Sequence, residues 1–294
     1  MWGNKPMGSY GILRIGDFEI YSTKNDFDPS LMMLFSEQDK RILPYAPAVN
    51  ENDSDPDSEY TPKAIVQYAI NLSAARDRLE FMGFTLLQAK HYFQGGLEQE
   101  LALLTERRAN PTWAKHEALR ATLDREEMVL KVLTFDTWLE GFSFIVSHQL
   151  NSDTGLWYEN KPSELPLTPL VRYMLGGSSE SSFGFPASDF RAFMRAAVEI
   201  TGTNAELVYD VTDLVEGGYF GADEDLCNYA RRDMVEDFAV NHKTVILTEG
   251  KSDKAVLEGS MKLFYPHLVD YYSFMDFEGV RAPGGAPALV SVKE

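Results

Sequence analysis

Thr244-Val245-Ile246-Leu247-Thr248-Glu249-Gly250-Lys251-Ser252-Asp253 is the stretch that decides the fold of the C-terminal part of this chain. An apolar run rich in β-branched residues stops at an acidic residue and a glycine, and a helix-compatible segment follows from Ser252 to Phe264. A buried strand that leads directly into a helix is typical of an α/β unit with a parallel sheet. Glu249 is therefore predicted to lie at the carboxyl end of a strand, where open α/β sheets hold their ligands.

The segments around Glu249 resemble the start of the TOPRIM domain, the metal-dependent module of topoisomerases, primases, OLD-type nucleases and RecR-like proteins. A second apolar segment runs from Leu268 to Met275, and Gly284-Gly285-Ala286-Pro287 opens another helix-like run. The resemblance implies the order strand, helix, strand, helix, with Glu249 as a general acid or base that also contributes to a metal environment. The family carries an Asp-x-Asp pair on a third strand, and the sequence reaches Glu294 without one, so we expect an incomplete site.

Residues close to Glu249 complete the predicted site. Gly250 lets the backbone approach a ligand closely, and Lys251 would contact a phosphate. Asp253 and Asp276 are weak candidate ligands for Mg²⁺, which demands octahedral oxygen ligation. We expect Mg²⁺ to bind only where further carboxylates complete the site. The alternative is that Glu249 only caps the helix that follows it.

The beginning of the chain resembles the HEPN/Toprim N-terminal domain, which bacterial genomes place ahead of HEPN or TOPRIM modules. The matching residues are Met7-Gly8-Ser9-Tyr10, Leu13-Arg14-Ile15-Gly16, Glu19-Ile20-Tyr21-Ser22-Thr23-Lys24 and Asp210-Val211-Thr212-Asp213-Leu214-Val215-Glu216-Gly217-Gly218-Tyr219-Phe220. The resemblance implies a component of a bacterial conflict or anti-phage defence system.

Composition excludes several classes of protein. The chain has 294 residues, of which 44% are hydrophobic, which favours folded domains over disorder. It lacks an apolar stretch long enough to cross a bilayer and a secretory signal, so we expect a cytoplasmic protein with no membrane partner. Cys227 is the only cysteine, which excludes an internal disulfide. The net charge of −18 argues against a surface that coats nucleic acid, although it is compatible with phosphate chemistry through a metal ion.

The predicted fold class is an α+β N-terminal domain with a helical middle region, followed by a partial α/β segment with a Rossmann-like parallel sheet. Residues 1–6 are predicted to be a leader or tag, 7–110 the N-terminal domain, 111–240 a mainly helical region that continues it, and 241–294 the incomplete TOPRIM-like segment. A β-hairpin is expected over Tyr10 to Ser22, with its turn at Gly16-Asp17. Asp28 is expected to start a helix through Leu34 and Phe35.

Apolar spacing predicts the remaining elements. Helices are expected over Ala64–Phe81, Leu86–Arg108, Trp113–His148 and, capped by Ser188, Ala187–Thr201. A strand is expected over 207–211, and an acidic helix over 229–238. Residues 50–59 read as a mobile acidic loop, and 151–185 as a long surface connection with a short helix at 170–175.

Two functions from different classes fit these patterns. The first is a Mg²⁺-dependent nuclease of the TOPRIM type, which is inactive alone or is completed by a partner. The second is a non-catalytic sensor or scaffold that recognises a phage or partner protein and forms oligomers. A Walker A loop and a nucleophile elbow are absent from the sequence, as is the closely spaced Arg–His pair of a HEPN ribonuclease.

Overall fold

The computed structural model describes two compact units, Met1–Asp225 and Leu226–Glu294. The described residues are 8–44, 64–111, 116–150, 167–176, 179–200, 205–237 and 243–277. The predictions made for residues 1–6, 50–59 and 284–287 lie outside them. None of the described helices combines the length and the apolar composition that a membrane crossing requires.

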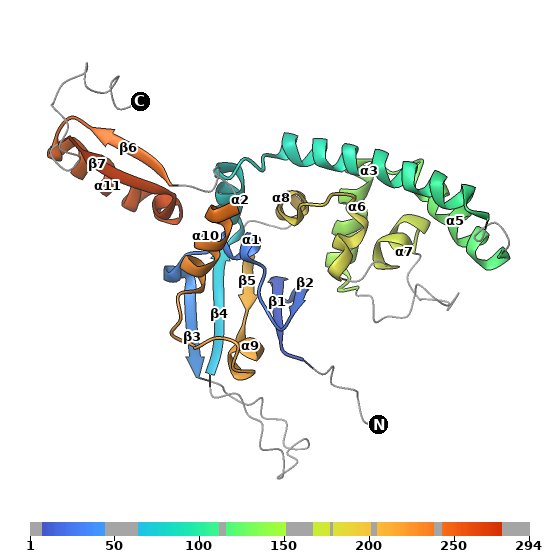
Figure 1. The fold of residues 1–294 in the computed structure, drawn as a ribbon, viewed down its shortest axis with the longest axis horizontal. Helices are drawn as coiled ribbons and strands as arrows, with labels where there is room; N and C mark the ends of the chain where they lie inside the picture. Colours follow the sequence, from blue (N-terminus) through green and yellow to red (C-terminus); the bar gives the residue numbers. More distant parts are fainter. Residues whose placement is uncertain are drawn as a thin grey trace, which may run out of the picture. The chain divides into compact units, whose positions relative to one another are not determined.

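The first unit is built on an antiparallel sheet of five described strands: β1 (Tyr10–Ile15), β2 (Phe18–Lys24), β3 (Lys40–Pro44), β4 (Ala64–Asn71) and β5 (Glu206–Asp210). Their order across the sheet is β2-β1-β5-β4-β3 (Figure 1). The strand that comes last in the sequence therefore lies in the centre. Pairs such as Leu13 with Tyr209, and Tyr209 with Tyr68, fix the register on the buried face.

The predicted hairpin is confirmed. β1 and β2 are antiparallel neighbours joined at Gly16-Asp17, and Gly16 adopts a φ of 57°, which glycine reaches without strain. Leu13, Ile15 and Phe18 are all buried, as the alternation of apolar residues requires. The helix expected from Asp28 is shorter than predicted, because α1 spans only Pro29–Met32. The carbonyls of Met33 and Phe35 instead accept hydrogen bonds from the buried guanidinium of Arg78.

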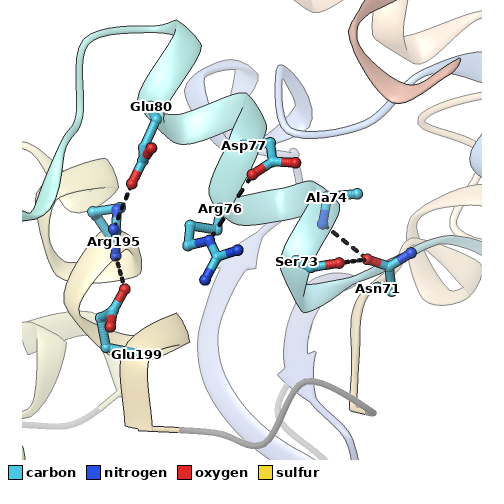
Figure 2. Close-up of polar contacts among 8 residues, drawn as sticks. All are labelled: Asn71, Ser73, Ala74, Arg76, Asp77, Glu80, Arg195 and Glu199. Atoms are coloured by element: carbon cyan, nitrogen blue, oxygen red, sulfur yellow. Dashed lines mark hydrogen bonds and ion pairs between the residues drawn. The ribbon is translucent and has the colours of Figure 1, made fainter. Parts of the chain in front are cut away.

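The helix predicted over Ala64–Phe81 is wrong in its first half. Residues Ala64–Asn71 form β4, which pairs with β3 on one side and with β5 on the other. The spacing of Ile65, Tyr68 and Leu72 fits a helix, yet β-branched and aromatic residues favour a strand where both neighbours are in place. The change to α2 (Leu72–Phe81) occurs at Asn71, whose Oδ1 accepts hydrogen bonds from the Ala74 amide and the Ser73 hydroxyl (Figure 2).

The other described elements of the first unit are helices and short helical turns (Figure 1). They are α3 (Leu86–Ala109), α5 (Glu117–Leu130), α6 (Phe135–Ser147), α7 (Pro169–Gly176), α8 (Phe190–Ile200) and α9 (Thr212–Glu216), with short 3₁₀ turns η1 (Glu37–Asp39) and η3 (Ser179–Gly184). The predicted α3 is confirmed. In its described part, 116–148, the segment predicted as one stretch over Trp113–His148 is divided into α5 and α6, because Thr134 caps α6 through a reciprocal bond with Thr137. Asp189, rather than the predicted Ser188, accepts the Arg191 amide at the start of α8.

An aromatic cluster forms the core of the helical region. Trp138 on α6 is fully buried, stacks on Phe142 and makes edge contacts with Phe185 and Phe193. Its indole nitrogen donates to the carbonyl of Phe183, 3.0 Å away. The prediction that 151–185 is a surface connection is therefore wrong at its C-terminal end. Two apolar residues of the same predicted segment, Met128 and Val132, lie outside this core and are 57% and 72% exposed.

A buried arginine connects α2 to α8. Arg195 on α8 is 3% exposed and donates to Glu80 Oε1 on α2 at 2.6 Å and to Glu199 Oε1 on its own helix at 2.5 Å (Figure 2). Both carboxylates are partly exposed, so they contact the buried Arg195 guanidinium on the side nearer to solvent. A buried charge that loses its partners is costly, and this triad therefore requires the two helices to stay in register.

The second unit contains α10 (Leu226–Asp237), β6 (Thr244–Thr248), α11 (Lys251–Phe264), the 3₁₀ turn η5 (Pro266–Tyr271) and β7 (Tyr272–Asp276). β6 and β7 are parallel neighbours joined through α11. The predicted order of strand, helix and strand is confirmed, and so is the parallel pairing. The fold as a whole is the predicted combination of an α+β part and a small parallel α/β segment.

Substitution of two adjacent glycines in α3 by alanine is expected to change stability in opposite directions. A Cβ on Gly96 would stand 1.1 Å from the Pro186 carbonyl oxygen, whereas a Cβ on Gly95 would meet nothing within 4 Å. We expect Gly96→Ala to lower the free energy of unfolding by about 1–3 kcal/mol, because the helix must move off the 186–187 backbone. Gly95→Ala should raise it by up to about 1 kcal/mol through helix propensity. Urea unfolding measures the free energy of unfolding of both variants. Equal effects of the two substitutions would contradict the close contact between Gly96 and the Pro186 carbonyl.

Alkaline pH is expected to destabilise the first unit. Burial raises the pKa of Tyr209 to about 12, and its hydroxyl accepts the Asp28 amide at 2.8 Å. In the unfolded chain tyrosine ionises near pH ~10. The stability gained from neutral Tyr209 is therefore fully present below pH ~10 and is lost as pH rises towards 12.

Urea midpoints at neutral and alkaline pH test this expectation. Tyr209→Phe should be less stable at neutral pH and should lose less stability on alkalisation than the wild type. Tyr219→Phe is the control, because Tyr219 is 46% exposed. A Tyr209→Phe protein with an unchanged alkaline loss would show that another group is responsible.

Candidate functional site

The carboxyl edge of the β6–β7 sheet carries the residues that the sequence singled out. Thr248, the last residue of β6, pairs with Asp276, the last residue of β7. Glu249 follows Thr248 directly and is exposed, whereas Asp276 is 7% exposed. Because the strands are parallel, both carboxylate-bearing residues stand at the same edge.

The turn from β6 into α11 is fixed by Thr248. This buried residue directs its hydroxyl at the carbonyl oxygens of Gly250 and Met275, at 3.1 and 3.2 Å. The hydroxyl thus connects the turn after Glu249 to the neighbouring strand. Gly250 is the N-cap of α11 with an extended φ of −128°, a conformation that other residues also adopt. A Cβ at this position would lie 3.8 Å from the Asp253 carboxylate, an ordinary contact, so the local packing does not require glycine, and close ligand approach at Gly250 stays a prediction.

Charged side chains of α11 surround this edge. Lys251 and Asp253 occupy the first turn and are exposed. One turn further, the ammonium of Lys254 lies 3.9 Å from the Asp276 carboxylate. Local positive charge is therefore present at the strand ends, together with the positive end of the helix dipole. Two lysines, Lys251 and Lys254, thus stand with three carboxylates, Glu249, Asp253 and Asp276, so the side chains at this edge do not by themselves favour an anion.

The residues present do not by themselves form a magnesium site. Within the described part of the chain, no group of three or more His, Cys, Asp or Glu side chains is arranged to hold a metal ion. The buried carboxylate of Asp276 already has a cation beside it in Lys254. Asp253 is exposed in the first turn of α11. Glu249, Asp253 and Asp276 would need oxygen ligands from elsewhere.

A second cluster joins stretches that are some two hundred residues apart in the sequence. The Tyr10 amide donates to Asp213 Oδ2 at 2.7 Å, which attaches β1 to α9. Ser9 and Asn25 exchange two hydrogen bonds, from the Ser9 amide to Asn25 Oδ1 and from the Asn25 amide to the Ser9 carbonyl. Phe27 contacts the Phe220 ring, with centroids 5.2 Å apart. We call this junction of residues 8–10, 25–27 and 212–220 the N-terminal clasp.

Asp210 links the clasp to the sheet. Its carboxylate accepts hydrogen bonds from Arg14 Nη1, Gln67 Nε2 and the Thr212 amide, and so connects β1, β4 and β5 with the start of α9. The carboxylate is occupied by these donors, which indicates a role in holding the fold. The sequence prediction missed the clasp, because a single sequence gives no sign that residues 8–10 meet residues 212–220.

Comparison with protein-family models gives a match over most of the chain. The family model described as HEPN/Toprim N-terminal domain 1 matches residues 7–234. This range includes the whole clasp and the five-stranded sheet, and it stops before Glu249. No curated protein and no solved structure matches the chain.

The clasp predicts a specific loss of stability. Asp213→Ala removes the acceptor of the Tyr10 amide and should lower the free energy of unfolding by about 1–3 kcal/mol. Asp213→Asn keeps a side-chain oxygen and should recover much of the loss. Urea unfolding of both variants tests the expectation, and an Asp213→Ala protein as stable as the wild type would contradict it.

Proposed function

The chain belongs to the HEPN/Toprim N-terminal domain 1 family, and we propose that it is a cytoplasmic component of a bacterial anti-phage conflict system that acts on nucleic acid. The family model covers residues 7–234, most of the chain, and the family suggests a conflict-system component. The action on nucleic acid is assigned to the second unit, which the model leaves almost entirely outside its match.

The observation that carries the assignment is the parallel pairing of Thr248 with Asp276. It brings Glu249 and Asp276 to one sheet edge beside the N-terminus of α11. Phosphodiester transfer needs a group that moves a proton at one oxygen, and an exposed carboxylate at a strand end meets that need. In this proposal Glu249 is the general acid or base, while the Gly250 backbone and Lys251 contact a phosphate of the substrate.

Mg²⁺ binding at this edge requires more oxygen ligands than the described residues supply. We propose that Mg²⁺ enters the site only where carboxylates outside the described residues, or from a partner chain, join Glu249, Asp253 and Asp276. A single accessible carboxylate binds Mg²⁺ weakly, since this ion keeps most of its waters unless several oxygen ligands are provided. Without such ligands the chain is expected to lack nuclease activity.

Glu249→Gln tests the catalytic assignment. Plasmid DNA, single-stranded DNA and RNA are incubated with the protein, alone and with its genomic partner proteins, in the presence of Mg²⁺ or Mn²⁺. Any cleavage should fall by about 10²-fold or more in Glu249→Gln, because a general acid or base contributes a factor of this size. Glu258→Gln is the control, since that residue pairs with Lys262 on α11. Equal cleavage by the wild type and Glu249→Gln would refute the role.

A second function is favoured by the edges of the small sheet. Among the described residues, β6 and β7 pair only with each other, and parallel strands ordinarily have neighbours on both sides and covered faces. Unpaired edges readily accept a strand from another protein. A non-catalytic scaffold that recognises a phage or partner protein would use this feature. Absence of cleavage in every assay above, with the fold intact, would favour it.

A further inference from the structure

Charged residues lie on the side of α11 that packs towards its sheet. Lys254, Glu258 and Met261 are partly buried, and their spacing of four and three residues places them on one side of the helix. None of the fourteen residues of α11 is fully buried. A helix that packs on a sheet ordinarily turns an apolar side towards it. Contacts of charged groups therefore contribute to holding α11 on β6 and β7.

Lys254 places its ammonium group beside a buried carboxylate. Asp276, the last residue of β7, is 7% exposed, and its Oδ2 lies 3.9 Å from Lys254 Nζ. A carboxylate that is largely removed from water is stabilised by a nearby cation, because burial penalises its charged form. Lys254 supplies such a cation from within the chain.

The position of this ammonium group is not rigidly fixed by Asp276. The separation of 3.9 Å is longer than a hydrogen bond, and the side chain of Lys254 is 35% exposed on a flexible four-carbon stem. A second carboxylate, Glu258, stands one turn along α11. Its pKa is lowered, first by the hydrogen bond from Lys262 and to a smaller extent by the charge of Lys254. Lys254 therefore has another carboxylate within electrostatic range if it moves away from Asp276.

A divalent ion and Lys254 would compete for the same carboxylate. Of the three candidate ligands, Glu249 and Asp253 are exposed to water, whereas Asp276 is buried. An ion that coordinated Asp276 would stand close to the Lys254 ammonium, and like charges a few ångströms apart repel each other. The residues present thus fit an internal ammonium group better than Mg²⁺.

We propose that Lys254 is a tethered cation that takes the place of a metal ion beside Asp276. With Lys254 in position, α11 stays on the strands in the absence of metal, and an ion has to displace the ammonium group before it can use Asp276. The proposal concerns stability and ion binding, so it does not depend on catalysis by Glu249.

Hydrogen exchange of the full-length protein tests the stabilising role. Exchange of the amides in 244–277 should be the same for the wild type in EDTA and in millimolar Mn²⁺. In EDTA, Lys254→Gln should exchange about two- to tenfold faster in this segment, because Asp276 loses a neighbouring charge. Mn²⁺ should return Lys254→Gln towards the wild-type rate, because the ion then replaces the ammonium group.

Two further variants serve as controls. Lys243→Gln removes the same charge five residues before Thr248, roughly 16 Å along β6, which is beyond the screening length of about 8 Å at physiological ionic strength. It should respond to neither EDTA nor Mn²⁺. Lys254→Gln combined with Asp276→Asn lacks the shared carboxylate, so Mn²⁺ should not restore it.

Three results of the exchange experiment would overturn the proposal. The first is a Lys254→Gln protein that exchanges as slowly as the wild type in EDTA. The second is a Lys254→Gln protein that Mn²⁺ fails to restore, or restores equally without the Asp276 carboxylate. The third is a wild type that Mn²⁺ protects as strongly as the variant.

Mn²⁺ binding, followed by electron paramagnetic resonance of the free ion, tests the competition. Lys254→Gln should bind Mn²⁺ about tenfold more tightly than the wild type, the size expected when a single positive charge about 5 Å from a divalent ion in water is removed. Equal affinity, or undetectable binding in both proteins, would refute the competition. Neither readout involves cleavage, so failure of this proposal and failure of the catalytic role of Glu249 are separate results.

Discussion

The position of β5 between β1 and β4 is the constraint on which the first unit depends. Leu207 and Tyr209 complete the buried face of the sheet, and without them the hairpin of β1 and β2 has no connection to β3 and β4. The chain reaches β5 only after α2, α3, α5, α6, α7 and α8. The helical region is therefore an insertion between two adjacent strands, and it has to return the chain to the middle of the sheet.

Close contacts meet this requirement. Gly96 lets α3 touch the backbone at Pro186, just before α8 begins, and Trp138 holds the carbonyl of Phe183 a few residues earlier. Arg195 then fastens α8 to α2, the helix that leaves β4. Each of these contacts holds a segment that leads the chain back to β5. The clasp at Tyr10 and Asp213 secures the chain again immediately after β5.

Local signals made part of this fold predictable. The turn at Gly16-Asp17, the periodicity of α3 and the change from strand to helix after Glu249 depend on neighbouring residues, and all three are confirmed. Ala64–Asn71 was mistaken for a helix because the spacing of its apolar residues fits both a helix and a strand. Only the pairing with β3 and β5 decides in favour of the strand. Phe183 and Phe185 have loop-like neighbours in sequence, yet they enter an aromatic core assembled from three helices. For the candidate site, the sequence placed Glu249 at the end of a strand and named Asp276 as a weak ligand. Their shared sheet edge, the hydroxyl contacts of Thr248 and the lysine beside Asp276 were seen only in the structure.

The central strand also has a consequence for biosynthesis. β1 ends at residue 15 and its inner neighbour starts at residue 206, so a ribosome must add about 190 residues before the pair can form. At ordinary elongation rates this takes on the order of 10–40 s. Throughout that interval the nascent hairpin presents an open strand edge and the apolar side chains of Leu13 and Ile15. Successful production of this protein in a cell therefore depends on shielding during translation, and slow codons or scarce chaperones should reduce its yield more than its final stability suggests.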